Sequence, residues 1–275
     1  MRVALAIAAM VIGVAVGAVI SGSSKWDRAT ANELATMAAA ATPLEPCSGA
    51  DLNALPAPVS RFIQSALAAG RPCASSVTIT QNAEMFLNGS WRPLEATQHY
   101  SVSPPGFVWD ARIDAAPLMR VLVRDQYISG RGALRASLLG VYPLADQRAS
   151  PELNAGELQR FLGETVWFPT ALLPSSSLKW TSRDDRSAVA SLTDHGTTVS
   201  LTFEFDEARI TAIRGFRYKE DGGRYALQPW LIRCRDHAER DHVLIPLQCE
   251  VSWIEGDQSM PYWRGRITSV SYGYN

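Results

Sequence analysis

The chain lacks an excess of charge of either sign. It has 275 residues, with 26 Lys and Arg against 27 Asp and Glu, and a formal net charge of -1. Binding to nucleic acid depends on clustered positive charge, so this balance argues against a nucleic-acid partner. With 47% hydrophobic and 19% charged residues, the chain is also too apolar to be disordered. We therefore expect a folded protein that does not bind nucleic acid.

The sequence also lacks the short motifs of common catalytic sites. It contains no Gly-x-Ser-x-Gly elbow and no glycine-rich phosphate loop. Its histidines lack the spacing of a zinc enzyme, although His237 and His242 could approach one another across a turn together with Asp236 or Asp241. Asp-His pairs at turns are usually turn residues, so we expect no metal and no cofactor.

One long apolar run stands at the N-terminus. Residues 3–20 are all apolar or Gly, and no charge lies between Arg2 and Lys25. As a helix this run would span about 27 Å, close to the hydrocarbon thickness of a membrane. We therefore predict a signal anchor, with a cleaved signal peptide ending near residues 16–18 as the alternative. Lys and Arg are nearly balanced across the run and leave its orientation open.

The four cysteines indicate the cellular compartment in which the domain lies. A hairpin predicted over residues 230–237 and 243–253, with its turn at residues 241–242, places Cys234 directly opposite Cys249. Facing residues have Cα atoms about 4.5 to 5.5 Å apart, within reach of a disulfide. Cys47 and Cys73 would form the second bridge, while four buried thiols are the alternative. Two bridges would place the domain outside the cytoplasm.

Helical and extended patterns divide the rest of the chain. Residues 26–41 are Ala-rich and predict a stalk helix, and residues 58–67 have an apolar stripe that predicts a second helix. Residues 155–167 predict a third helix, with Asn154 and Glu157 as its capping pair. The other segments alternate with period two and predict strands at 77–81, 94–102, 107–113, 118–128, 133–139, 179–183, 188–193, 198–205, 210–219, 225–237, 243–253 and 262–272.

Short turns join consecutive strands and indicate an antiparallel meander. Eleven or twelve strands exceed what an open twisted sheet tolerates, so the sheet should curl into a half barrel or barrel with one or two covering helices. The predicted fold class is thus mainly β, preceded by a transmembrane helix. We expect three parts, namely residues 1–24 as anchor or signal peptide, residues 25–50 as stalk and linker, and residues 51–275 as one β-rich domain.

Several stretches in the same order resemble a bacterial family that is defined only as a domain of unknown function. The resemblance spans roughly residues 50–272 and implies no activity. By analogy of fold alone, such a curled sheet is similar to the half-barrel periplasmic carriers of lipoproteins. The four cysteines depart from the family pattern. The stretches that carry the resemblance are residues 55–59, 106–113, 130–132, 138–140, 151–153, 156–158, 166–174, 196–203 and 262–266.

Aromatic residues give the strongest candidates for a ligand site. Residues 167–174 form an apolar segment bounded by prolines, which the sheet, a partner or lipid must cover. Core packing explains most Trp residues in a large β domain, but an apolar pocket beneath the third helix is the functional alternative. The expected lining of that pocket is Trp109, Trp167, Phe168, Leu172 and Trp263.

Three polar residues could also belong to such a site. Asp110 and Arg112 are two apart on a strand and share one face, opposite the core face, where they either pair on the outer surface or line the open side of the sheet. Glu164 lies two helical turns after Glu157, on the same helix face. Two carboxylates across a cleft would suit a hydrolase, whereas carboxylates on a helix surface are usually solvated.

These observations predict a membrane-anchored module outside the cytoplasm that binds a lipid-like or other apolar ligand without covalent chemistry. The alternative from another class is a hydrolase that uses Asp110, Glu157 or Glu164 at the mouth of the sheet. A third possibility is a scaffold that only contacts envelope proteins. A hollow apolar interior would favour the binding module, and a filled interior would favour the scaffold.

Overall fold

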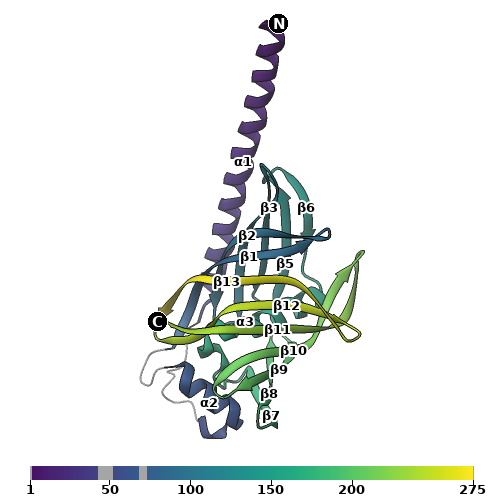
Figure 1. Ribbon diagram of the computed structural model, residues 1–275. Coiled ribbons are helices and arrows are strands. Elements are labelled where there is room, and N and C mark those ends of the chain that lie inside the picture. Colours follow the sequence, from purple (N-terminus) through teal and green to yellow (C-terminus); the bar gives the residue numbers. More distant parts are fainter. Residues whose placement is uncertain (1, 43–51, 68–72, 275) are drawn as a thin grey trace.

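The computed structural model describes residues 2–42, 52–67 and 73–274, and it contains one large sheet with a few helices (Figure 1). The helices are α1 (Arg2–Ala40), α2 (Ala57–Ala66) and α3 (Pro151–Glu164), with 3-10 turns η2 (Leu52–Ala54), η3 (Thr165–Trp167) and η4 (Pro169–Leu172). The strands are β1 (Ala74–Leu87), β2 (Ser90–Ser101), β3 (Gly106–Ala116), β4 (Met119–Ile128), β5 (Arg131–Leu138), β6 (Tyr142–Gln147), β7 (Leu178–Asp184), β8 (Ser187–Asp194), β9 (Thr197–Asp206), β10 (Arg209–Asp221), β11 (Arg224–Arg240), β12 (Val243–Glu255) and β13 (Gln258–Tyr274).

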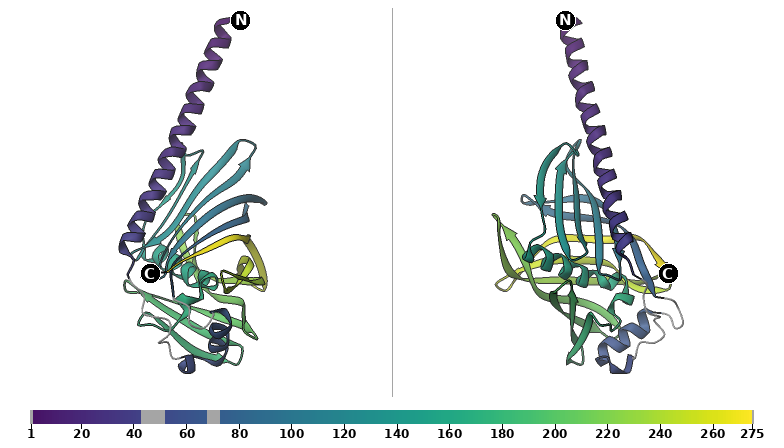
Figure 2. Two further views of the ribbon diagram at one scale, coloured as in Figure 1. Left: turned by 90° about the vertical axis from the view of Figure 1, so that its left-hand side faces the viewer. Right: turned by 180° about the vertical axis from the view of Figure 1, so that it is seen from behind.

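The 13 strands in the described ranges belong to a single antiparallel sheet. Its order is β6-β5-β4-β3-β2-β1-β13-β12-β11-β10-β9-β8-β7, so the first and last strands meet at the centre and β6 and β7 form the two edges. The sheet curls strongly without closing (Figure 2). The predicted fold class is confirmed. The strand that the sequence did not predict is β6, which is short, mostly exposed and interrupted by Pro143.

The two faces of the sheet follow the parity that the sequence predicts for β3. Phe107, Trp109, Ala111 and Ile113 point into the main core on the concave side. Val108 points to the other side and packs with residues of α1. Residues 106–109 of β3 are therefore all buried, because each face of the strand has its own covering helix, α3 inside and α1 outside.

Helix α3 lies in the concavity and contacts both halves of the sheet. It packs against β3, β4 and β5 on one side and β9 and β10 on the other. The helix begins earlier than predicted, because Ser150 is the N-cap and accepts a hydrogen bond from the Leu153 amide at 3.2 Å. The prediction that Asn154 and Glu157 form the capping pair was therefore wrong. Asn154 instead accepts a hydrogen bond from the Gly132 amide at 2.8 Å.

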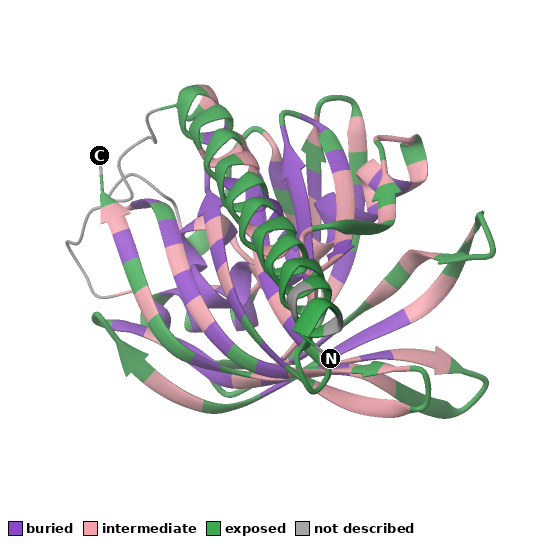
Figure 3. Cartoon of the chain, turned by 90° about the horizontal axis from the view of Figure 1, so that it is seen from above, coloured by how far each residue is buried: buried purple, intermediate pink, exposed green. Residues whose placement is uncertain are grey.

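Helix α1 is continuous and has two different halves. Its N-terminal half is exposed and apolar, and the helix is long and apolar enough to cross a membrane. Its C-terminal half lies on the convex face of β2, β3 and β4 (Figure 3). There the Trp26 indole donates to Asp110 at 2.9 Å, and Arg124 donates to Thr30 at 2.8 Å. The helix is thus attached to the sheet after it leaves the apolar run.

The helix α2 confirms the apolar stripe predicted from the sequence. Val59, Phe62, Ile63 and Ala66 are buried, and the helix packs near β8 and β12. Pro58 occupies its first turn, where a missing backbone N–H costs nothing. This helix closes the end of the sheet away from the N-terminal half of α1 (Figure 1).

The cysteines correct one prediction. Cys234 faces Cys249 across β11 and β12, as the predicted register requires. Their sulfur atoms are 3.3 Å apart, however, and both are buried thiols, so the predicted disulfide between them was wrong. A disulfide needs a sulfur separation of about 2.05 Å. The pairing of Cys73 with Cys47 lies outside the described residues, because Cys47 is not among them.

Candidate functional site

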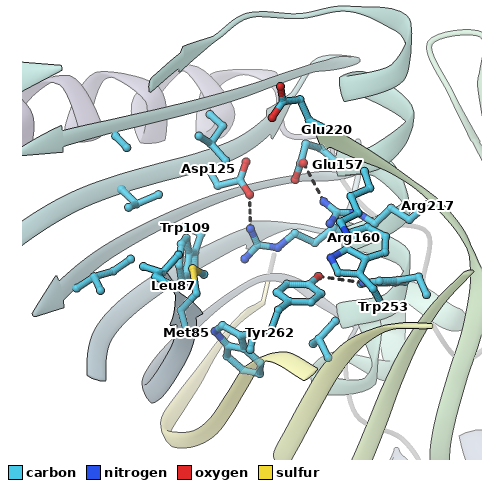
Figure 4. Close-up of a pocket in the computed structure, with 18 of the residues that line it drawn as sticks. Met85, Leu87, Trp109, Asp125, Glu157, Arg160, Arg217, Glu220, Trp253 and Tyr262 are labelled. Atoms are coloured by element: carbon cyan, nitrogen blue, oxygen red, sulfur yellow. Dashed lines mark hydrogen bonds and ion pairs between the residues drawn. The ribbon is translucent and has the colours of Figure 1, made fainter. Parts of the chain in front are cut away.

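A cavity of about 680 Å³ lies between α3 and the concave face of the sheet (Figure 4). Side chains from β1 to β6 and from β10 to β13 form its walls, and α3 contributes one side. Its aromatic lining is Trp109, Trp167, Tyr218, Tyr225, Trp230, Trp253, Tyr262 and Trp263. Its aliphatic lining includes Met85, Leu87, Ile113, Val121, Val123, Leu134, Leu144 and Val251. The cavity exists because a sheet of this curvature is wider than one helix can fill.

The ends of three hairpins surround the open side of the cavity. Asn88 belongs to the β1–β2 turn, Ala115 lies near the end of β3, and Lys219 and Glu220 lie near the end of β10. Leu144 of β6 lines the cavity and is 51% exposed. Most of the deep wall is thus aromatic and aliphatic. Charged side chains appear at the rim, on α3 and at Asp125 and Arg217, which face α3 from the sheet.

Arg160 of α3 is the centre of a buried polar cluster on the cavity wall. Its guanidinium pairs with Asp125 of β4 and, at 2.8 Å, with Glu164 one helical turn later. It also lies over the rings of Phe107 and Trp109, with its central carbon 4.9 and 5.0 Å from their centroids. Burial opposes its charge, but Glu164 and Asp125 hold the pKa of Arg160 above its usual value. Arg160 therefore stays charged inside an apolar wall.

Glu164 accepts two further hydrogen bonds from the sheet. Gln98 donates to its Oε2 at 2.7 Å, and the hydroxyl of Tyr100 donates to the same atom at 3.1 Å. Gln81 lies beside Gln98 and accepts a hydrogen bond from the Trp109 indole at 3.0 Å. These bonds satisfy most of the polar groups beneath α3 and fix the helix against β1, β2 and β3.

A second buried pair joins α3 to β10. Arg217 donates to Glu157 Oε1 at 2.9 Å and to the Gly156 carbonyl at 3.0 Å. Burial, reinforced by the charge of Asp125, raises the pKa of Glu157 to about 8, against the opposing effect of Arg217. Glu157 Oε2 and Asp125 Oδ1 are buried and accept no hydrogen bond from the residues that the structure describes.

These charges balance when Glu157 is protonated. Asp125, Glu157 and Glu164 would carry three negative charges, whereas Arg160 and Arg217 carry two positive charges. A proton on Glu157 would make the cluster neutral, consistent with the direction of its pKa. Because Arg217 already donates to Oε1, that proton would reside on Oε2. The cluster can then present both guanidinium donors and a neutral carboxyl group next to an apolar cavity.

Four of the candidate residues predicted from the sequence line the cavity. These are Trp109, Trp167, Trp263 and Glu164. Phe168 and Leu172 lie behind the wall, are fully buried and do not line it. The apolar segment after α3 is thus covered by the sheet. Within it, Trp167 donates to the Pro246 carbonyl at 3.2 Å, and the Phe168 ring lies 4.5 Å from that of Tyr100.

Asp110 and Arg112 lie on the opposite face of the sheet. Asp110 accepts from Trp26, and Arg112 pairs with Asp27 of α1 at 2.9 Å. They also contact each other at 3.5 Å. The structure therefore places Asp110 on a different side of the sheet from Glu157 and Glu164. These three carboxylates share no cleft.

Sequence reasoning missed the arginines and Asp125. Asp125 follows Val121 and Val123 at inward positions of β4, and a charged residue in such a pattern indicates a buried partner. Arg160 precedes Glu164 by four residues, a spacing that allows an ion pair on a helix. No pattern in the sequence links Arg217 to Glu157, because they are sixty residues apart and meet only when the sheet curls.

The histidines form no metal site in the part of the chain that the structure describes. No group of three His, Cys, Asp or Glu side chains there could hold a metal ion. His237 lies close to the Ile210 carbonyl, with its Nε2 at 2.9 Å, and His242 pairs with Glu239.

Three solved structures are similar to this chain at low identity. An outer membrane lipoprotein-sorting protein domain from Vibrio parahaemolyticus is 10% identical with a TM-score of 0.40, and the match covers 72% of this chain and 85% of that one. A LolA superfamily protein from Nitrosomonas europaea is 11% identical with a TM-score of 0.41, covering 81% and 96%. A DUF1329 family protein from Desulfovibrio piger is 9% identical with a TM-score of 0.39, covering 79% and 93%.

The sequence comparisons give a family and no activity. No curated protein matches the chain. A family model described as a family of unknown function (DUF6920) matches residues 53–272, which include the whole sheet except the last residues of β13 and also include α2 and α3. The chain therefore belongs to the DUF6920 family.

Proposed function

We propose that this protein is a membrane-anchored module that binds the apolar part of a lipid-like ligand in the cavity beneath α3. The observation that carries the proposal is the cavity itself. Its volume of about 680 Å³ is typical of small-molecule sites, and its walls are mainly aromatic and aliphatic. A filled interior would have suited a scaffold, but this interior is hollow.

The buried cluster on α3 supports a ligand with one polar end. Arg160 and Arg217 border the cavity. Arg160 is held in place by two carboxylates, and Arg217 is held by Glu157 and a backbone carbonyl. Such fixed donors suit the oxygen atoms of a headgroup, while the apolar walls receive the chain. The hydrolase alternative has less support, because Asp110 lies across the sheet and an arginine holds each of Glu157 and Glu164.

We further place the domain outside the cytoplasm, with α1 as the anchor. This placement rests on the apolar run of α1 and on the expected pairing of Cys47 with Cys73, since Cys234 and Cys249 are thiols. It is independent of the ligand proposal.

A substitution that fills the cavity tests the proposal. Ala136 of β5 lines the cavity, so Ala136→Phe should occupy part of its volume. Ala226→Phe is the matched control, because Ala226 lies exposed on β11 and does not line the cavity. The full chain is placed in lipid nanodiscs that contain a phospholipid with a photoreactive group at the end of its acyl chain. After irradiation, cross-linked peptides are mapped by mass spectrometry.

We expect wild type and Ala226→Phe to cross-link within β4, β5 and α3, and Ala136→Phe to do so several-fold less. Cross-links to residues 3–20 of α1 serve as an internal reference, because the membrane segment contacts lipid in every variant. Cross-links confined to α1 in the wild-type protein would refute binding in the cavity. So would equal cross-linking of the cavity strands in all three proteins.

A further inference from the structure

Two neighbouring hairpin ends consist entirely of apolar residues. The β3–β4 end is residues 115–119, and the β5–β6 end is residues 138–144; neither contains a polar side chain apart from the Tyr142 hydroxyl. Other hairpin ends carry polar or charged turns, such as Asn88-Gly89 and Asp241-His242. We call the two apolar ends the apolar tips.

The apolar tips expose large side chains to a degree that is unusual for a soluble surface. Leu118 is 97% exposed, Tyr142 66%, and Val141 and Leu144 are each 51% exposed. Leu118 and Leu139 have φ angles of 62° and 55°, a left-handed conformation that is unfavourable for leucine. Contiguous exposed apolar surface of this kind marks an interaction site.

The apolar tips lie side by side. The amide of Leu139 in one tip donates to the carbonyl of Arg120 beside the other at 2.8 Å. Their strands are adjacent in the sheet, and both hairpins extend toward the exposed half of α1 (Figures 1 and 2). They therefore form one continuous apolar surface.

The position of helix α1 indicates what covers this apolar surface. Gly22 packs so closely on the β5–β6 tip that a Cβ atom there would lie 2.6 Å from the Gly140 carbonyl oxygen. The apolar run of α1 ends two residues earlier, at Ile20, which is 62% exposed. The tips thus lie at the level where the helix would enter a bilayer.

We propose that the apolar tips dip into the surface of the membrane that α1 enters. Leu118 and Val141 would reach the upper acyl chains, and Tyr142 suits the interface, where its ring is buried and its hydroxyl is hydrated. The domain would then be held by two contacts, the helix and the tips, in one orientation. Ala115 and Leu144 also line the cavity, so the cavity would open next to the lipid; this last consequence rests on the proposed function.

Two aromatic substitutions with matched exposure test the proposal. Tyr142→Trp places an indole on a tip, and Phe216→Trp places one on β10, where Phe216 is 64% exposed, nearly the same as Tyr142. The full chain is reconstituted in nanodiscs of ordinary lipid and of lipid brominated near the headgroup end of the acyl chain. Bromine quenches an indole only at short range, and the eight native Trp residues are subtracted with the wild-type protein.

We expect brominated lipid to remove most of the emission added by Tyr142→Trp and none of that added by Phe216→Trp. Adding Leu118→Asp to Tyr142→Trp should restore part of the emission. The proposal would be overturned if the emission added by Tyr142→Trp were the same in brominated lipid as in ordinary lipid, as is expected for Phe216→Trp. Unquenched emission together with a two-copy mass by native mass spectrometry would also overturn it and assign the tips to a second copy. Ala136→Phe should leave the quenching unchanged, so this proposal and the ligand proposal can fail separately.

Discussion

At the scale of single residues, the feature that distinguishes the site is a buried carboxyl group. Glu157 has a side chain that is only 4% exposed, and it lies between Arg217 and the negative charge of Asp125. Burial penalises its charged form more than Arg217 favours it, so the pKa rises to about 8. A residue that would normally carry charge thus enters the wall of an apolar cavity as a neutral group.

This pKa predicts a pH-dependent stability. Unfolding exposes Glu157 and returns its pKa to about 4.5, so between these values the folded protein holds a proton that the unfolded chain releases. The stabilisation is complete below pH 4.5 and is lost as the pH rises to 8, by about 1.4 kcal/mol per pH unit at most. Chemical unfolding of the full chain in nanodiscs from pH 5 to 8 should show this decline in the wild type.

Glu157→Gln should remove the decline, because glutamine keeps an oxygen for Arg217 but cannot titrate. Glu84→Gln should retain it, since the side chain of Glu84 is 40% exposed and pairs with Arg264 at the surface. Parallel pH profiles for wild type and Glu157→Gln would show that Glu157 is ionised in the folded protein at neutral pH.

At the scale of elements, α3 holds the curled sheet at a fixed width. The helix contacts both halves of the sheet and carries Glu157, Arg160 and Glu164 on the side that faces the cavity. Two glycines of this helix have different surroundings. A Cβ atom at Gly163 would lie 2.7 Å from Ile232 and 3.2 Å from the Trp230 ring, whereas at Gly156 the nearest atom would be 3.9 Å away.

The same substitution at the two glycines should therefore have opposite effects. Gly156→Ala should stabilise the protein by about 1 kcal/mol, because alanine favours the helix and meets no clash. Gly163→Ala should destabilise it by roughly 1 to 3 kcal/mol through overpacking. The Trp230 ring cannot move aside freely, because its indole donates to Tyr262 at 2.9 Å.

The free energy of unfolding of both variants decides this prediction, with Gly156→Ala as the control for helix propensity. A gain in stability for Gly163→Ala would mean that Ile232 moves into the cavity at little cost. That result would contradict the rigid packing inferred for this side of the cavity.

At the scale of the whole molecule, α1 and the sheet form one unit. Between Gly22 and Met37 the helix follows the convex face, joined by Trp26 to Asp110 and by Asp27 to Arg112. A flexible stalk would let the domain turn freely above a membrane. Here these contacts fix the direction of α1 relative to the sheet. Contact of the apolar tips with lipid requires such a fixed orientation.

A larger side chain at Gly22 should loosen this coupling. Gly22→Val would clash with backbone atoms of Gly140, which cannot move aside cheaply. Gly17→Val is the control, because no atom lies within 4 Å of a Cβ at Gly17. In nanodiscs, hydrogen exchange of amides in residues 26–37 should be faster in Gly22→Val and unchanged in Gly17→Val. Equal exchange in the two variants would show that the close approach does not fix the helix to the sheet.

The sequence alone determined the elements and much of their register. Period-two patterning predicted 12 of the 13 strands found in the described residues. Short turns predicted that neighbours along the chain are neighbours in the sheet, which holds except between the two edges, β6 and β7. The apolar run of residues 3–20 predicted the exposed half of α1. These features depend on the local order of apolar and polar side chains, whose period indicates a strand or a helix. The same local reasoning placed Cys234 opposite Cys249, but it could not show whether their sulfur atoms are bonded.

Only the tertiary structure decided what lies on the two faces of the curled sheet. It brought Arg217 to Glu157 and Arg160 to Asp125, and it buried Phe168 and Leu172 behind the cavity wall. It also placed Asp110 beneath α1 and set Gly22 against Gly140. These contacts join segments far apart in the chain. Their geometry depends on the curvature of the whole sheet, which no single stretch of sequence encodes.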